Sequence, residues 1–198
     1  MVELKSISKK FKTNIFKDFS YIFKKNNIYF LEGMNGSGKT TLLKLIKGIY
    51  LCDGGEIRFE HNLNQRNDVS YIDGNSRTFF HRLTVYQNLQ YFLSLQSKKK
   101  DSDSINKILD LFDASDLKDK VFSSLSQGQM QLISLVRGFL PDPKIVLLDE
   151  VFSSLDRDKK KMVLKYLSSF ILNEETLVIF TSHEDIHGEI NFVELNLS

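Results

Sequence analysis

One stretch of the chain has the residue types and spacing of a phosphate-binding loop. Residues 33–40 read GMNGSGKT, which fits the pattern G-x-x-x-x-G-K-[ST]. An apolar run at 28–31 precedes the loop and an amphipathic run at 41–46 follows it, and a strand–turn–helix context of this kind is the one in which the pattern binds phosphate. Glycine permits positive φ angles, so that backbone N–H groups can converge on an anion at a helix start. We therefore predict a nucleotide site.

The side chains of this loop have separate predicted tasks. Lys39 is placed to reach the β- and γ-phosphates, and the Thr40 hydroxyl to bind Mg²⁺. The residues expected to contact the nucleotide are Asn35, Gly36, Ser37, Gly38, Lys39, Thr40 and Thr41.

Two carboxylates follow the nearly all-apolar run 144–148. Ligands of α/β sheets bind beyond the carboxyl ends of the strands, where the phosphate loop also leaves its strand. Asp149 is thus placed to hold Mg²⁺, directly or through water, and Glu150 to polarise a water for attack on the γ-phosphorus, which typically contributes about 10²–10⁴-fold. Alone, the pair would equally well open a turn; the loop upstream favours the catalytic interpretation.

A second anion site is indicated at residues 125–129, LSQGQ, just before a predicted helix near Met130. Ser126, Gly128 and free N–H groups at a helix start can bind an anion. On its own the pentapeptide is more typical of a capped helix, and one nucleotide does not need two such sites in one fold.

The elements that must position these residues follow from hydrophobic periodicity. Expected strands lie at 2–7, 19–23, 28–31, 56–59, 69–72, 144–148 and 177–180, with a last short one around 192–195. Expected helices follow the phosphate loop and lie at about 85–93, from a Ser104 N-cap to 112, at 130–140 and at 156–171. The polar stretch 60–68 is expected to be a loop. The pattern predicts a parallel-sheet core lobe of about 1–73 and 141–198, with a helical lobe of about 75–140 inserted.

Composition excludes several classes of protein. The 198 residues carry 27 Lys+Arg and 25 Asp+Glu, and the lysine runs 98–100 and 159–161 are not interleaved with aromatics, so we expect no nucleic-acid partner. Cys52 is the single cysteine, which fits a reducing compartment. No signal-peptide segment and no apolar run near the roughly 18 residues of a membrane helix is evident. We expect a cytoplasmic protein that meets a membrane only through another polypeptide.

The phosphate loop 33–40, the LSQGQ segment 125–129 and the carboxylates 149–150 follow one another along the chain as in the ATP-binding cassette (ABC) ATPases. The chain resembles this family over nearly all of its length. Ser154-Leu155-Asp156 is similar to the family's D-loop, His183 to its switch histidine, and Phe11 to the aromatic that stacks on adenine. The resemblance implies an α/β P-loop NTPase fold with a mostly parallel core sheet, an antiparallel β edge and an inserted helical subdomain. It also implies ATP and Mg²⁺ as ligands.

The resemblance explains the second anion site, because two cassettes of the family sandwich two ATPs head to tail. Ser126, Gly128 and Gln129, with Asp156 nearby, would then meet the nucleotide held by the partner's loop. His183 would sense the γ-phosphate and help position the water. His183 and His187 have the spacing of two metal ligands, but no third ligand is evident.

Three departures from the family pattern bear on hydrolysis. Gly74 stands where the family places a glutamine that touches Mg²⁺ and the membrane partner; either Asp73 or Asn75 substitutes, or the contact is missing. Gln127 replaces the first signature glycine, and Val151-Phe152 replace the usual proline and threonine. These departures bear on the rate of hydrolysis and on coupling to the membrane partner, and they leave the predicted ATP-binding residues intact.

The resulting functional hypothesis is the ATP-hydrolysing subunit of a membrane transporter, driven by ATP-dependent dimerisation with an identical or a sister cassette. It would sit on the inner face of the membrane, bound to a separate transmembrane subunit, and its compact length resembles bacterial exporter subunits. The aromatic segment 79–83 would line the docking groove, or simply fill the helical lobe. The alternatives are a soluble cassette ATPase, a hydrolysis-impaired cassette paired with an active one, and a small-molecule kinase, which would leave 125–129 and His183 unexplained.

Overall fold

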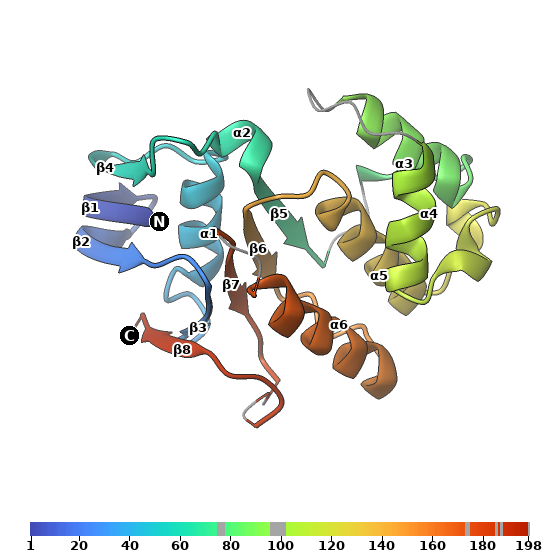
Figure 1. The fold of residues 1–198 in the computed structure, drawn as a ribbon. Helices are drawn as coiled ribbons and strands as arrows, with labels where there is room; N and C mark the ends of the chain where they lie inside the picture. The colour runs from blue at the N-terminus through green and yellow to red at the C-terminus, as the bar shows by residue number, and fades with distance from the viewer. Residues whose placement is uncertain (75–77, 96–101, 173–174, 185, 187, 198) are drawn as a thin grey trace.

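The computed structural model describes residues 1–74, 78–95, 102–172, 175–184, 186 and 188–197. They form two β-sheets and a set of helices (Figure 1). A five-stranded sheet has the order β5-β6-β7-β3-β8, and every neighbouring pair in it is parallel. Its strands are β3 (Asn27–Glu32), β5 (Val69–Asp73), β6 (Ile145–Asp149), β7 (Leu177–Thr181) and β8 (Val193–Asn196). An antiparallel sheet has the order β2-β1-β4 and contains β1 (Val2–Lys10), β2 (Asn14–Phe23) and β4 (Gly54–Phe59).

Helix α1 (Lys39–Lys47) lies between the two sheets (Figure 1). Its leucines and Ile46 join one buried cluster with alternate residues of β3, β6 and β7 and with the inner face of β1 and β2. Because strand side chains alternate between faces, the other residues of the same central strands belong to a second cluster, shared with the helices on the opposite side. This double cover explains why β6 and β7 are apolar almost throughout.

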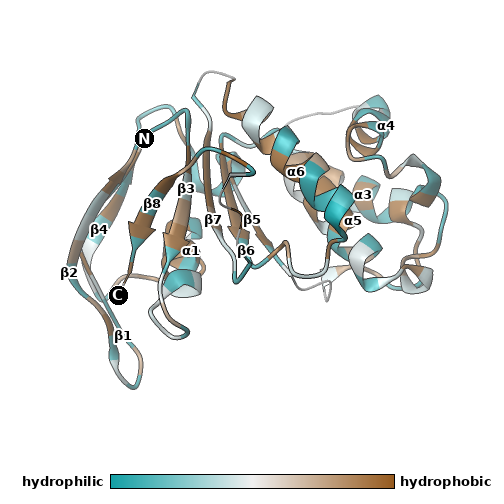
Figure 2. Ribbon diagram, turned by 90° about the horizontal axis from the view of Figure 1, so that it is seen from below, coloured by the Kyte–Doolittle hydropathy of each residue, from teal (hydrophilic) through white to brown (hydrophobic). Residues whose placement is uncertain are grey.

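The helices on the opposite side are α3 (Val85–Ser94), α4 (Ser102–Leu111), α5 (Gln127–Phe139) and α6 (Arg157–Phe170). Helices α3, α4 and α5 gather at one end of the molecule, beyond the carboxyl end of β5 (Figure 1). Figure 2 shows the central strands mainly in brown, whereas α6 carries both teal and brown residues, as expected for a helix with one solvated face. The division into lobes near residues 74 and 140 stays a prediction.

Two local predictions were wrong. Ser104 lies inside α4 rather than capping it, because the helix begins at Ser102. The polar segment before β5, expected to be a loop, contains the short helix α2 (Gln65–Asp68), whose N-cap Asn64 accepts hydrogen bonds from the N–H groups of Arg66 and Asn67. In the part of the chain that is described, no helix combines the length and apolar character needed to cross a membrane.

Candidate nucleotide site

The start of α1 is built to receive an anion. Its N-cap is Gly38, with φ 103°, and no side chain of the described residues caps the helix. Helices α3, α5 and α6 by contrast each have a capping side chain, from Thr84, Ser126 and Asp156. The first N–H groups of a helix lack partners within the helix, so at α1 they remain available to a phosphate at the positive end of the helix dipole.

Glycine is required at position 38 for steric as well as conformational reasons. A Cβ atom there would lie 2.7 Å from Ile15 Cγ2 and 2.9 Å from Phe16 Cζ. The positive φ already disfavours any other residue. Strand β2 therefore packs closely against the phosphate loop. Ile15 of this strand also lines the cavity next to the loop.

The loop encloses a cavity of about 370 Å³ lined by Ile15, Asn35, Gly36, Gly38, Lys39, Thr40, Thr41, Glu150 and His183. Lys39, which is 8% exposed, donates from Nζ to the carbonyls of Gly33 (2.6 Å) and Met34 (3.2 Å). The buried Ser37 Oγ has no hydrogen-bond partner among the described residues. A buried hydroxyl without a partner is costly, and a phosphate group in the loop would supply one. The residues present thus fit a nucleotide.

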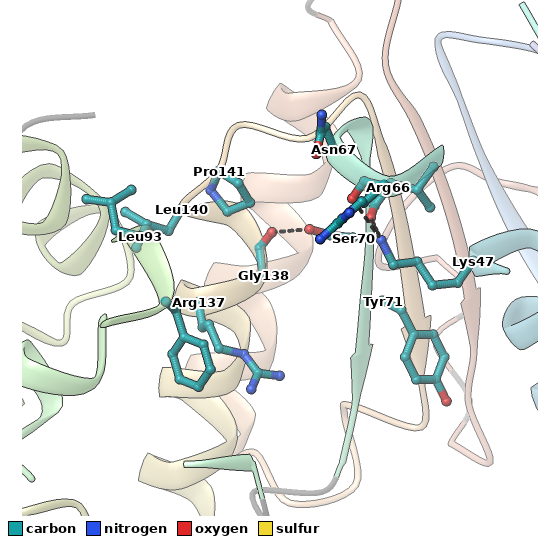
Figure 3. Close-up of a pocket in the computed structure, with 12 residues that line it drawn as sticks. Lys47, Arg66, Asn67, Ser70, Tyr71, Leu93, Arg137, Gly138, Leu140 and Pro141 are labelled. Carbon is teal, nitrogen blue, oxygen red and sulfur yellow. Dashed lines mark hydrogen bonds between the residues drawn. The ribbon is translucent and has the colours of Figure 1, made fainter. Parts of the chain in front are cut away.

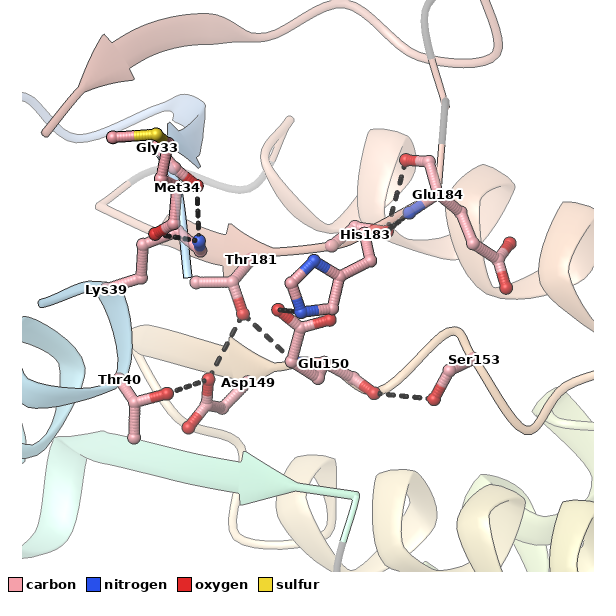
Figure 4. Close-up of polar contacts among 11 residues, drawn as sticks. Gly33, Met34, Lys39, Thr40, Asp149, Glu150, Ser153, Thr181, His183 and Glu184 are labelled. Carbon is pink, nitrogen blue, oxygen red and sulfur yellow. Dashed lines mark hydrogen bonds and ion pairs between the residues drawn. The ribbon is translucent and has the colours of Figure 1, made fainter. Parts of the chain in front are cut away.

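Asp149, at the end of β6, accepts hydrogen bonds from three hydroxyl groups on three different elements. Thr40 Oγ1 and Thr181 Oγ1 donate to Oδ1 at 2.9 and 3.1 Å, and the Tyr71 hydroxyl donates to Oδ2 at 2.7 Å. Burial, followed by the hydrogen bond to Asp149, raises the pKa of Tyr71 far above its usual range, so it remains a donor. Figure 4 shows the Thr40 and Thr181 contacts. Hydroxyl and carboxylate oxygens are the ligands that Mg²⁺ prefers.

Glu150 is held in an unusual backbone conformation beside Asp149. Its φ is 56°, which for a non-glycine residue is uncommon and typical of functional sites. The Glu150 N–H donates to Thr181 Oγ1 (3.0 Å), and its Oε1 lies 3.3 Å from His183 Nε2 (Figure 4). The loop after His183 is tied to α6 by an ion pair between Glu184 and Lys160. A carboxylate and an imidazole therefore face each other over the cavity.

The signature-like segment begins α5 with reciprocal caps. Ser126 Oγ accepts from the Gln129 N–H (3.3 Å), and Gln129 Oε1 accepts from the Ser126 N–H (3.0 Å). Ser126 and Gln127 are exposed. A Cβ atom on Gly128 would lie 2.8 Å from the Ser154 carbonyl oxygen, so the segment packs closely on the D-loop-like stretch. None of these residues lines the phosphate-loop cavity.

Asp156 and Phe11 also lie outside that cavity. Asp156 caps α6 by accepting from the Lys159 N–H (2.9 Å). Phe11 is 49% exposed, and its ring packs edge-on against Tyr50 at 5.4 Å between centroids, with Lys9 Nζ 5.3 Å from the Phe11 centroid. An exposed ring face suits stacking on a base.

The region of the missing glutamine is only partly described. Asp73 is paired in register with Asp149 but does not line the cavity, and Asn75 lies outside the described residues, as does His187. A Cβ atom on Gly74 would meet the Glu150 carbonyl oxygen at 3.5 Å. Among the described residues, no group of three or more His, Cys, Asp or Glu side chains is placed to hold a metal.

A second cavity of about 210 Å³ lies between α5, β5 and α2 (Figure 3). The charged groups among its lining residues are the cations Lys47, Arg66 and Arg137. The Arg137 guanidinium lies 4.8 Å from the centroid of the Phe79 ring. Phe79 is buried and stacks on Phe122, whereas Phe80 is 45% exposed. The 79–83 segment thus combines one core aromatic with one surface aromatic.

The structure brings the predicted Lys39, Thr40, Asp149, Glu150 and His183 together at the carboxyl ends of β3, β6 and β7. It adds residues that were not predicted, namely Ile15, Tyr71 and Thr181. For Thr181 the signal was available, since it ends an apolar strand as Asp149 does. Tyr71 had no comparable signal, because it lies within its strand.

Fold and site together define a P-loop nucleotide-binding protein of the α/β class. The ABC transporter family model matches residues 16–153, and the chain belongs to this family. It is 32% identical over 93% of its length to a Fe(3+) ions import ATP-binding protein of Haemophilus influenzae, covering 55% of that protein. It is 28% identical over 92% of its length to a sulfate/thiosulfate import ATP-binding protein of Escherichia coli strain K12, covering 53%. The chain thus spans about half the length of the curated relatives it matches.

Solved structures of cassettes share the fold. A dimeric bacterial ABC transporter cassette superposes with a TM-score of 0.85 at 18% identity, covering 100% of this chain and 95% of that one. A cassette bound to ADP and Pi gives 0.81 at 19% identity, covering 93% and 88%. At these identities the likeness establishes the fold alone, and it confirms the predicted fold class.

Proposed function

We propose that the chain is the Mg²⁺-ATP-hydrolysing subunit of a membrane transporter. The observation that carries this proposal is the contact of Thr40 with Asp149 at the mouth of the phosphate loop, with Glu150 and His183 beside it. Family membership supports ATP as the nucleotide. The kinase alternative gives no role to His183 or to residues 125–129.

Each group at the site has a task in this reaction. Lys39 and the N–H groups at the start of α1 bind the β- and γ-phosphates. Thr40 and Asp149 would hold Mg²⁺, which neutralises phosphate charge. Glu150 accepts a proton from the attacking water, and His183 Nε2 orients the water and Glu150.

The remaining predicted ligands would act on the nucleotide of a second cassette. Ser126, Gly128 and Gln129 lie outside the phosphate-loop cavity and Ser126 is exposed, so a partner's triphosphate can approach them. The dimeric cassette with the same fold supports this arrangement. The partner is an identical or a sister cassette.

A separate membrane-spanning subunit is part of the proposal, because the relatives are named as import ATP-binding proteins. The chain would bind it at the cytoplasmic face of the membrane. The interpretation of the chain as an exporter subunit, which rests on its length, stays a prediction. A soluble cassette ATPase would instead purify from cells without a membrane protein.

The test is ATP turnover by the purified protein in Mg²⁺. We expect steady phosphate release by the wild type, loss of nucleotide binding in Lys39→Ala, and binding without turnover in Glu150→Gln. Removal of Mg²⁺ by EDTA should stop turnover. Nucleotide binding without turnover in the wild type would instead support the hydrolysis-impaired cassette.

A further inference from the structure

We propose that Tyr71 is a positioning residue for the metal-binding carboxylate. This inference rests on the proposed Mg²⁺-ATP site, and it concerns a side chain that belongs to no motif of the chain. The Tyr71 hydroxyl donates to Asp149 Oδ2 at 2.7 Å. In the parallel pair of β5 and β6, Tyr71 stands opposite Leu147, so its long side chain reaches two residues forward to the strand end.

The three donors to Asp149 do not have equivalent roles. Thr40 is itself a proposed metal ligand, so its hydroxyl would serve both the carboxylate and the metal. Thr181 and Tyr71 are not proposed metal ligands, and they donate to one carboxylate oxygen each. Asp149 is 6% exposed, so water does not readily replace a lost donor. With Tyr71 in place the carboxylate plane is fixed at both oxygens, and Oδ1 stays directed at Thr40.

The two ends of Tyr71 contact different surroundings. The residue lines the cavity between α5, β5 and α2, and its hydroxyl points away from that cavity (Figure 3). Phenylalanine at position 71 keeps the ring and its packing while removing the one donor to Oδ2 among the described residues. The substitution therefore separates the hydrogen bond from the shape of the side chain.

The experiment measures binding of trinitrophenyl-ATP, displaced by a non-hydrolysable ATP analogue, in Mg²⁺ and in EDTA. The readout is the ratio of the two affinities, because it isolates the contribution of the metal. In Tyr71→Phe we expect this ratio to fall about 10-fold, the low end for residues that orient a metal ligand, with unchanged affinity in EDTA. In an Asp149→Asn background, Tyr71→Phe should change the ratio no further.

Tyr29→Phe is the matched control. Tyr29 is buried in the same sheet, whereas Tyr71 is half-buried. The Tyr29 hydroxyl accepts from the Lys24 N–H, so the variant loses a hydrogen bond remote from Asp149. We expect its Mg²⁺ ratio to equal the wild-type value. An unchanged ratio in Tyr71→Phe, an equal loss in EDTA, or a full effect in the Asp149→Asn background would overturn the inference. Absence of any Mg²⁺-dependent binding in the wild type would instead overturn the proposed function.

Discussion

Thr181 connects the two acidic residues of the site. Its Oγ1 donates to Asp149 Oδ1 and accepts the Glu150 N–H, and the residue is fully buried. One hydroxyl therefore contacts both the proposed metal-binding carboxylate and the strained backbone of the proposed catalytic base. Thr181 thus links Asp149 and Glu150 in the polar network at the end of β6.

Thr181→Val should lower ATP turnover at least about 10-fold, since it removes a donor next to a metal ligand. It should also lower the free energy of unfolding by about 1–3 kcal/mol, because the Glu150 N–H loses its acceptor. Thr176→Val is the control: Thr176 is buried and donates to the Phe170 carbonyl, away from the site. Turnover is measured at a temperature where both variants are folded. Equal turnover in the two would show that Thr181 does not contribute to the reaction through Asp149 or Glu150.

The motifs predict individual side chains well where the contact is local in sequence. Lys39 and Thr40 share one loop, and Asp149 is marked by the apolar strand before it. Tyr71 could not be predicted as a site residue, because it lies 78 residues from Asp149 in the sequence. Their contact depends on the register between β5 and β6. Phe79 and Phe80 could not be told apart either, since a short loop without periodicity does not show which ring is buried.

At the scale of elements, the start of α5 and the segment before α6 are in close backbone contact. The approach of the Ser154 carbonyl to Gly128 leaves no room for a side chain at position 128. A side chain at position 128 would therefore push the signature-like segment and the D-loop-like segment apart. Both belong to the surface proposed to meet the partner cassette.

Gly128→Ala should separate these two segments and abolish ATP-dependent dimerisation. Nucleotide affinity of the single chain should remain within about twofold, because residue 128 does not line the phosphate-loop cavity. Gly54→Ala is the control, since a Cβ atom there meets Ser8 Cβ at an ordinary 3.5 Å. Light scattering and nucleotide titration check the two effects; dimerisation of Gly128→Ala at the wild-type ATP concentration would contradict the packing argument.

The turn before β4 is tied to β1 by a carboxylate. Asp53 accepts from Lys9 Nζ (2.8 Å) and from the Lys10 N–H (2.7 Å), and these bonds hold the pKa of Asp53 below its usual value. A carboxyl with a depressed folded-state pKa stabilises the fold above its unfolded pKa of about 3.9 and loses this effect as pH falls through the folded value.

Wild type should therefore melt at a higher temperature than Asp53→Asn at pH 7, and the difference should shrink below about pH 4. Thermal unfolding of both proteins from pH 7 down to about pH 2 is the measurement, because the loss falls below the unfolded pKa. A difference that is constant with pH would show that the charge of Asp53 contributes nothing. The effect should be small, since the pair lies at the surface.

For the whole molecule, the sequence predicted the class of fold because the central strands are apolar on both faces and end in chemically distinctive residues. The parallel sheet, the antiparallel edge and the family are confirmed. The start of α4 was predicted wrongly, because the polar run contains several residues of a capping type and the helix already begins at Ser102. The lobe boundaries and the roles of the site residues stay predictions.

The central claim is that ATP is held between the phosphate loop of one cassette and the Ser126–Gln129 segment of another. Light scattering of Glu150→Gln in saturating Mg²⁺-ATP tests it most directly, because the variant retains ATP that the wild type would consume. The account predicts a shift from one chain to two on addition of Mg²⁺-ATP, reversed by EDTA and absent when Lys39→Ala is added. A Glu150→Gln protein that binds Mg²⁺-ATP yet remains a single chain, alone and with any sister cassette, would contradict it.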